Sequence, residues 1–125
     1  MSPKTAARVL VIDSSSENRE LLGTLLRRQG VEVLTSRRAA PAQSLSERQS
    51  PDLIVLDAES DYLASPTEVA DLGRTATVSS IPIVVLGTKT KHLTPLETGH
   101  FVSKPYHYGE LIRRISELLG PRLEA

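Results

Sequence analysis

Short apolar runs recur along the chain, and the clearest of them end at a polar or charged residue. Three of these runs are followed directly by Asp13, Asp57 and Lys104. Runs of four or five residues rich in Val, Ile and Leu are typical of strands that are buried on both faces of a parallel sheet. The pattern predicts strands over residues 8–12, 31–34, 53–56, 83–86 and 100–103.

Apolar residues at helical spacing alternate with these strands. Residues 14–16 are serines that offer an N-cap to a first helix, and Gly30 ends it. One face of that helix is predicted to carry Leu21, Leu22, Leu25 and Leu26. Further helices are predicted over residues 38–49, 66–77 and 110–119. Residues 87–99 contain few apolar side chains, so we expect the helix of that interval to be short or missing.

Strands that alternate with helices through short links predict right-handed crossovers and a three-layer α/β sandwich. In an open parallel sheet the strands deliver their last residues to one common edge. Asp13, Asp57 and Lys104 should therefore meet in one crevice. Two carboxylates beside an ammonium group could hold a divalent cation and an anionic group together.

Composition narrows the function classes. The 125 residues predict a single domain over 1–125, and 15 basic against 15 acidic residues give no attraction to nucleic acid or acidic lipid. The chain has no cysteine, which excludes thiolate sites and is compatible with the cytosol, where we expect the protein. No run is long enough to span a membrane, and aromatic residues are too scarce for a platform that stacks nucleic-acid bases.

Several segments together resemble the receiver domain of two-component response regulators, over nearly the whole chain. The resemblance is carried by residues 9–13, 17–22, 51–57, 81–86 and the Lys104-Pro105 pair. It implies a flavodoxin-like (βα)5 fold with a five-stranded parallel sheet. It also implies that Asp57 is the phosphoacceptor, that Asp13 and Asp57 bind Mg²⁺, and that Lys104 pairs with the phosphoryl group. A cis bond before Pro105 and a histidine kinase as partner follow from the same resemblance.

The chain departs from the family pattern at the same site. Ser14 stands where receivers carry a second acid, so Mg²⁺ binding should be weak. Gly87 stands where the fourth strand of receivers ends in Ser or Thr, and Thr88, one place later, is only a weak substitute. Glu59 follows the phosphoacceptor position closely and is a weak candidate for a replacement metal ligand.

These departures predict a degenerate receiver that binds a signalling protein and is phosphorylated poorly. The alternative is a working receiver that a histidine kinase phosphorylates on Asp57 in the presence of Mg²⁺. A flavodoxin-like enzyme is disfavoured because the sequence shows no nucleophile–base pair and the serines at residues 14–16 lack the glycines of a phosphate loop. We expect no other cofactor, and a homodimer through the last helix is compatible with the sequence.

Simpler interpretations stand beside these. Asp13 and Asp57 could be acids that cap the segments after their strands, and Lys104 could be a surface lysine. Without a phosphoryl group, Lys104 would form an ion pair with Asp57 or Asp13. Tyr106 and Tyr108 could bind a partner, although aromatic side chains in loops more often cover the core. Solvated helix faces are the expected places of three arginine pairs, 27–28, 37–38 and 113–114.

Overall fold

A single parallel sheet organises the chain in the computed structural model, which describes residues 6–57, 66–87 and 99–120. The strands lie in the order β2-β1-β3-β4-β5. They are β1 (Arg8–Ile12), β2 (Glu32–Ser36), β3 (Leu53–Asp57), β4 (Ile83–Gly87) and β5 (Gly99–Ser103). The helices are α1 (Ser16–Arg28), α2 (Ala39–Gln49), α3 (Pro66–Val78) and α4 (Tyr108–Leu119).

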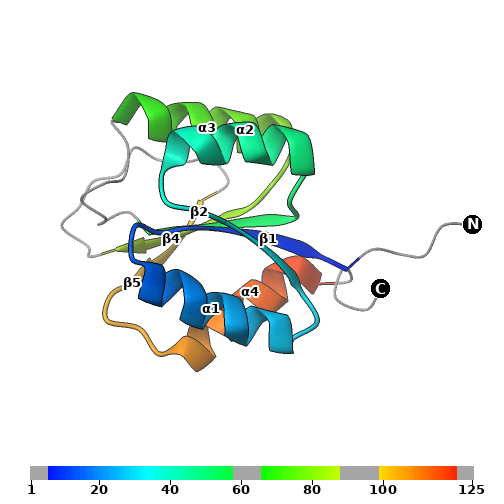
Figure 1. Ribbon diagram of the computed structural model, residues 1–125, viewed down its shortest axis with the longest axis vertical. Helices are drawn as coiled ribbons and strands as arrows, with labels where there is room; N and C mark the ends of the chain where they lie inside the picture. Colours follow the sequence, from blue (N-terminus) through cyan, green and yellow to red (C-terminus); the bar gives the residue numbers. More distant parts are fainter. Residues whose placement is uncertain (1–5, 58–65, 88–98, 121–125) are drawn as a thin grey trace, which may run out of the picture.

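Helices cover both faces of the sheet and complete three layers, with α2 and α3 on one side and α1 and α4 on the other (Figure 1). The strand residues alternate between the two sides. Val9, Val11 and Val55 belong to the core beneath α1 and α4, whereas Leu10 and Ile54 belong to the core beneath α2 and α3. This alternation explains why the central strands are apolar at every position. The flavodoxin-like fold is confirmed.

The strand order reverses between β1 and β3. The chain runs from β1 outward to β2 and then returns to place β3 on the other side of β1. In open α/β sheets, ligands bind at the carboxyl ends of the strands where such a reversal occurs. The fold therefore marks the ends of β1 and β3 as the place for a site.

Helix α1 shows how local signals fix an element. The Ser15 hydroxyl caps it by accepting a hydrogen bond from the Asn18 backbone N–H at 3.2 Å. Gly30, with a φ of +82°, follows its C-terminal end. Leu22 and Leu26 are buried, but Leu21 is 45% exposed. The buried face is thus narrower than the four leucines predicted.

Most predicted element boundaries hold within two residues. The predicted strand over 31–34 lies instead at 32–36, because Val31 donates its backbone N–H to Leu26 O and the polar residues that follow pair with β1. The predicted last helix starts two residues earlier, at Tyr108. The short or missing helix expected between β4 and β5 falls on residues 88–98, outside the described residues. No helix in the described ranges is long and apolar enough to cross a membrane.

Candidate functional site

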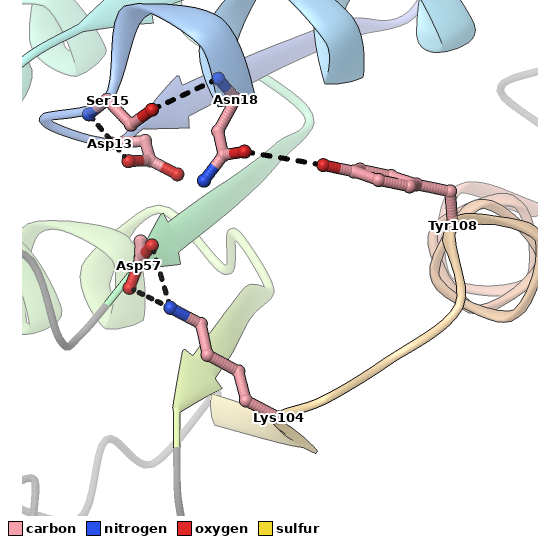
Figure 2. Close-up of polar contacts among 6 residues, drawn as sticks. All are labelled: Asp13, Ser15, Asn18, Asp57, Lys104 and Tyr108. Carbon is pink, nitrogen blue, oxygen red and sulfur yellow. Dashed lines mark hydrogen bonds and ion pairs between the residues drawn. The ribbon is translucent and has the colours of Figure 1, made fainter.

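The ends of three strands meet in one crevice. Asp57 is the last residue of β3, Asp13 follows β1 directly, and Lys104 follows β5 directly. Both aspartates are buried, each with 5% of its surface exposed. Figure 2 shows the three side chains directed toward one another. The convergence predicted from the strand ends is confirmed.

Lys104 lies against both oxygens of the Asp57 carboxylate. Its Nζ is 2.9 Å from Oδ1 and 3.0 Å from Oδ2 of Asp57. The backbone N–H of Lys104 donates to the carbonyl oxygen of Gly87 at 2.8 Å, which fixes the start of the lysine relative to β4. The Lys104-Pro105 bond is cis, as the resemblance implied. Lys104 is therefore the ion-pair partner of Asp57, and the surface-lysine interpretation is wrong.

Asp13 is the aspartate of the crevice whose pKa is shifted. Burial raises the pKa of its carboxyl above the usual 3.8. A hydrogen bond of 2.9 Å from the Ser15 backbone N–H to Oδ1 opposes that rise, while the neighbouring Asp57 charge adds to it. The negative charges of the two carboxylates therefore repel one another in a site that is partly shielded from water. Such a site favours the arrival of a cation.

Asn18 completes the crevice, and sequence analysis gave it no role. Its Oδ1 accepts a hydrogen bond from the Tyr108 hydroxyl at 3.4 Å. Its amide nitrogen then points to the side of Asp13 (Figure 2). The sequence signals were its position three residues after the helix cap at Ser15 and its place in the segment 17–22 that carries the resemblance. The contact with Tyr108 joins residues 90 positions apart and depends on how α1 packs beside α4.

Tyr106 and Tyr108 form an edge-to-face pair, with ring centroids 5.6 Å apart and planes at 81°. Both rings pack against the core beneath α1 and α4, as expected for aromatic residues that cover a core. Burial, followed by the charges of neighbouring groups that include Asp57 and Asp13, raises the pKa of Tyr106 to about 12. Tyr106 is therefore close enough to interact with the charges of the two aspartates, and Tyr108 begins α4.

The donor set fits a weakly held Mg²⁺. Asp13 and Asp57 offer carboxylate oxygens, the ligand type that Mg²⁺ prefers, and waters usually complete its shell. Ser14 is neutral, and within the described ranges no three His, Asp or Glu residues cluster in a way that could hold a metal. Gly87 ends β4 without a hydroxyl. The two weak candidates, Glu59 and Thr88, lie outside the described residues.

Comparisons with known proteins agree with this arrangement. The transcriptional regulatory protein PrrA of Mycobacterium tuberculosis is 32% identical over 123 residues, which cover 94% of this chain and 52% of that protein. The probable transcriptional regulator ycf27 of Cyanophora paradoxa is 31% identical over 114 residues, with 90% and 48% covered. The chain spans about half the length of these curated relatives. No protein-family model matches the chain.

Solved structures share the fold. The chemotaxis response regulator CheY4 of Vibrio cholerae superposes with a TM-score of 0.74 at 24% identity, covering 92% of this chain and 100% of that one. The receiver domain of the hybrid histidine kinase CckA superposes with a TM-score of 0.73 at 21% identity, with 91% and 100% covered. Sequence and fold point the same way: the chain has the fold of the receiver domains of two-component response regulators, and its sequence is similar to that of transcriptional regulators over about half of their length.

Proposed function

We propose that this chain is a receiver domain of a two-component response regulator, that it acts mainly by binding a signalling protein and that phosphorylation of Asp57 is impaired. The observation that carries the proposal is the composition of the crevice. Lys104 contacts both oxygens of Asp57, and Ser14 stands where a second acid would be needed to hold a metal firmly. Phosphorylation must therefore displace an existing ion pair with weak help from a cation.

The loss of Mg²⁺ affinity that follows from the missing second acid can be estimated. When bound, Mg²⁺ would neutralise negative charge that builds up beside Asp57 during phosphoryl transfer. Two unit charges about 4 Å apart interact by about 4 kcal/mol at an effective dielectric constant near 20, before desolvation and screening are counted. Even a third of that energy is about tenfold in affinity. Ser14 cannot supply this charge.

Gly87 supports the same conclusion. A hydroxyl at the end of the fourth strand could donate a hydrogen bond to an oxygen of an incoming phosphoryl group. Gly87 has no side chain, and its carbonyl oxygen already accepts the backbone N–H of Lys104. The β4 end therefore offers fewer donors to an anionic group on Asp57.

A working receiver is the second candidate, favoured by the positions of Asp57 and Lys104. In that case an oxygen of Asp57 would form a bond to phosphorus while the bond from phosphorus to the donor's leaving group breaks. Lys104 would then move from the carboxylate to the phosphoryl oxygens. The donor would be a histidine kinase, with Mg²⁺ bound by Asp13 and Asp57.

The experiment that separates the two is phosphorylation by a small donor. The protein is incubated with Mg²⁺ and acetyl phosphate, or with beryllofluoride, and examined by intact mass and amide chemical shifts. We expect little or no adduct. A stable adduct that is absent in Asp57→Asn would establish the working receiver and overturn our proposal.

A rescue variant tests the reason for the impairment. Ser14→Asp should tighten Mg²⁺ binding about tenfold and increase the adduct on Asp57. The matched control is Ser16→Asp, which adds the same charge at an exposed position two residues along the chain and should leave Mg²⁺ affinity nearly unchanged. Equal affinity in both variants would show that the second acid is not the missing ingredient.

The remaining assignments belong to the same proposal. Residues 1–125 act as one signalling domain with no enzymatic reaction of their own. Partners are a histidine kinase or another signalling protein, and a homodimer through α4 is compatible with this role. The curated relatives are named transcriptional regulators, but the chain aligns with only about half of each. We assign neither nucleic-acid nor membrane binding to this domain.

A further inference from the structure

A cavity lies at the same edge of the sheet as the crevice, beside the end of β2. Its volume is about 400 Å³, and the described residues that line it are Arg19, Thr35, Ser36, Arg37 and Arg38. We call it the arginine pocket. Three of its five described lining residues are arginines, although the chain as a whole has 15 basic and 15 acidic residues. Positive charge is therefore concentrated at this place.

Hydrogen bonds hold the walls of the arginine pocket in place. Arg19 Nη1 donates to the carbonyl oxygen of Asp13 at 2.5 Å, and the backbone N–H of Asp13 donates to Ser36 O at 3.1 Å. The Ser36 hydroxyl donates to the carbonyl oxygen of Arg38 at 2.8 Å. These bonds join α1 to β2 and fix the turn that carries Arg37 and Arg38. The site therefore requires little rearrangement to bind a ligand.

The charges of the pocket are available to a ligand. Arg37 and Arg38 are exposed, and within residues 6–57, 66–87 and 99–120 no ion pair joins either of them to a carboxylate. Arg19 contacts the carbonyl oxygen of Asp13, not its carboxylate, which accepts the Ser15 N–H instead. The first turn of α2, which starts directly after Arg38, contains no acidic residue. The positive end of the α2 helix dipole therefore adds to the positive potential of the arginine pocket.

We propose that the arginine pocket binds the dianion of a phosphate monoester. Guanidinium groups pair with phosphate oxygens in a bidentate way, and three of them match a doubly charged group better than a single carboxylate. The hydroxyl of Thr35 adds a further donor. The phosphate could belong to a small metabolite or to a phosphorylated amino acid. This site needs neither Mg²⁺ nor phosphorylation of Asp57.

The test is a titration of the protein followed by amide and arginine Nε–H chemical shifts. The probes are inorganic phosphate, O-phosphoserine, ADP and, as a diester control, dimethyl phosphate. We expect saturable shifts centred on residues 35–38 and Arg19, with the monoesters at least about threefold tighter than the diester because of their second charge. Tighter binding of O-phosphoserine or of ADP identifies the source of the phosphate.

Charge-matched variants decide whether the pocket is specific. Arg37→Gln/Arg38→Gln should weaken phosphate binding about tenfold, because two charge-assisted contacts are lost. The control Arg113→Gln/Arg114→Gln removes the same charge from an exposed pair on α4 and should change affinity less than about twofold. Amide spectra confirm that each variant is folded. A milder pair, Arg37→Lys/Arg38→Lys, keeps the charge, loses the bidentate geometry and should give an intermediate affinity.

Three outcomes would overturn the proposal. They are the absence of saturation, equal losses in the two glutamine variants, and shifts centred on the crevice instead of residues 35–38. Asp57→Asn separates this proposal from the proposed function. It abolishes any adduct at the crevice and should leave phosphate binding in the arginine pocket unchanged.

Discussion

The crevice and the arginine pocket lie along one edge of the sheet and differ in sign and in depth. The crevice holds two aspartates that are each 5% exposed, and Lys104 forms an ion pair with one of them, Asp57. The arginine pocket presents exposed guanidinium groups. Charges in a partly dry site interact strongly, whereas solvated charges interact weakly and stay available to a ligand. The crevice charges should therefore influence stability, and the pocket charges should influence binding.

Asp13 connects the two regions. Its carboxylate faces the crevice, while its backbone contacts Arg19 on one side and Ser36 on the other. Asp13 thus contributes its side chain to the crevice, and its backbone forms hydrogen bonds that hold the walls of the arginine pocket in place. Substitutions that change only the side chain should alter the crevice and leave the pocket intact.

The largest expected effect is the loss of the lysine from the crevice. Lys104→Met should lower the free energy of unfolding by about 2 kcal/mol, because it leaves the buried carboxylate of Asp57 without its ammonium partner. Chemical denaturation at neutral pH measures the change. In an Asp57→Asn background the same substitution should lower the free energy of unfolding clearly less, since the negative charge that Lys104 compensates is gone.

An exposed ion pair provides the control for that prediction. Arg74 contacts Asp71 one turn away on α3, with 70% of the arginine side chain exposed. Arg74→Gln should change the free energy of unfolding by less than about 1 kcal/mol. A loss as large as that of Lys104→Met would remove the distinction between buried and solvated charges.

A smaller effect, with a pH dependence, is expected at Asp13. Its pKa is raised above 3.8 in the folded protein, so its stabilising contribution is complete below 3.8 and is lost as the pH rises through the raised value. At neutral pH the ionised carboxylate is a net cost. Asp13→Asn should therefore raise the free energy of unfolding at neutral pH, while keeping an acceptor for the Ser15 N–H.

The pH profile checks the cause of this gain. Unfolding curves measured from neutral to acidic pH should show the gain of Asp13→Asn disappearing as the pH falls below about 3.8. Asp71→Asn, which removes a carboxylate of the ion pair on α3, should show no gain at neutral pH. A gain at Asp13 that persists in acid would mean that packing, not charge, explains it.

The smallest effect on stability is expected at the arginine pocket. Arg37→Gln/Arg38→Gln should alter the free energy of unfolding by less than about 0.5 kcal/mol without ligand, because both side chains are solvated. Thermal unfolding with and without inorganic phosphate measures this. Phosphate should raise the melting temperature of the parent protein more than that of the variant, which binds it more weakly. A large loss without ligand would assign the two arginines a structural role.

Much of the fold was predictable because it depends on local pattern. The apolar runs predicted four of the five strands closely, and the serines at 14–16 and Gly30 marked the two ends of α1, of which Ser15 is the cap. The strand at 31–34 was placed early because Val31 has the same apolar character whether it belongs to a strand or to the exit of a helix. The backbone hydrogen bond from Val31 to Leu26 O shows that Val31 belongs to the exit of α1, and this bond depends on how the chain folds after the helix.

For the charged residues too, the local pattern predicted some features, and the three-dimensional fold decided others. Arg37 and Arg38 were predicted on a solvated helix face, but α2 begins after them and they lie in the turn that follows β2. Their partnership with Arg19 could not be predicted, because it requires the order β2-β1 and the packing of α1 beside it. Asn18 was missed for a similar reason, since its contact with Tyr108 joins α1 to α4.

By itself, the sequence determined that Asp13, Asp57 and Lys104 stand at the ends of strands and so meet at one edge, because parallel strands all point the same way. The tertiary structure alone decided which atoms meet there. Lys104 contacts both oxygens of Asp57, and Arg19 contacts the carbonyl oxygen of Asp13 and not its carboxylate. Strand order and side-chain rotamers set these contacts, and neither is encoded in a local pattern of apolar and polar residues.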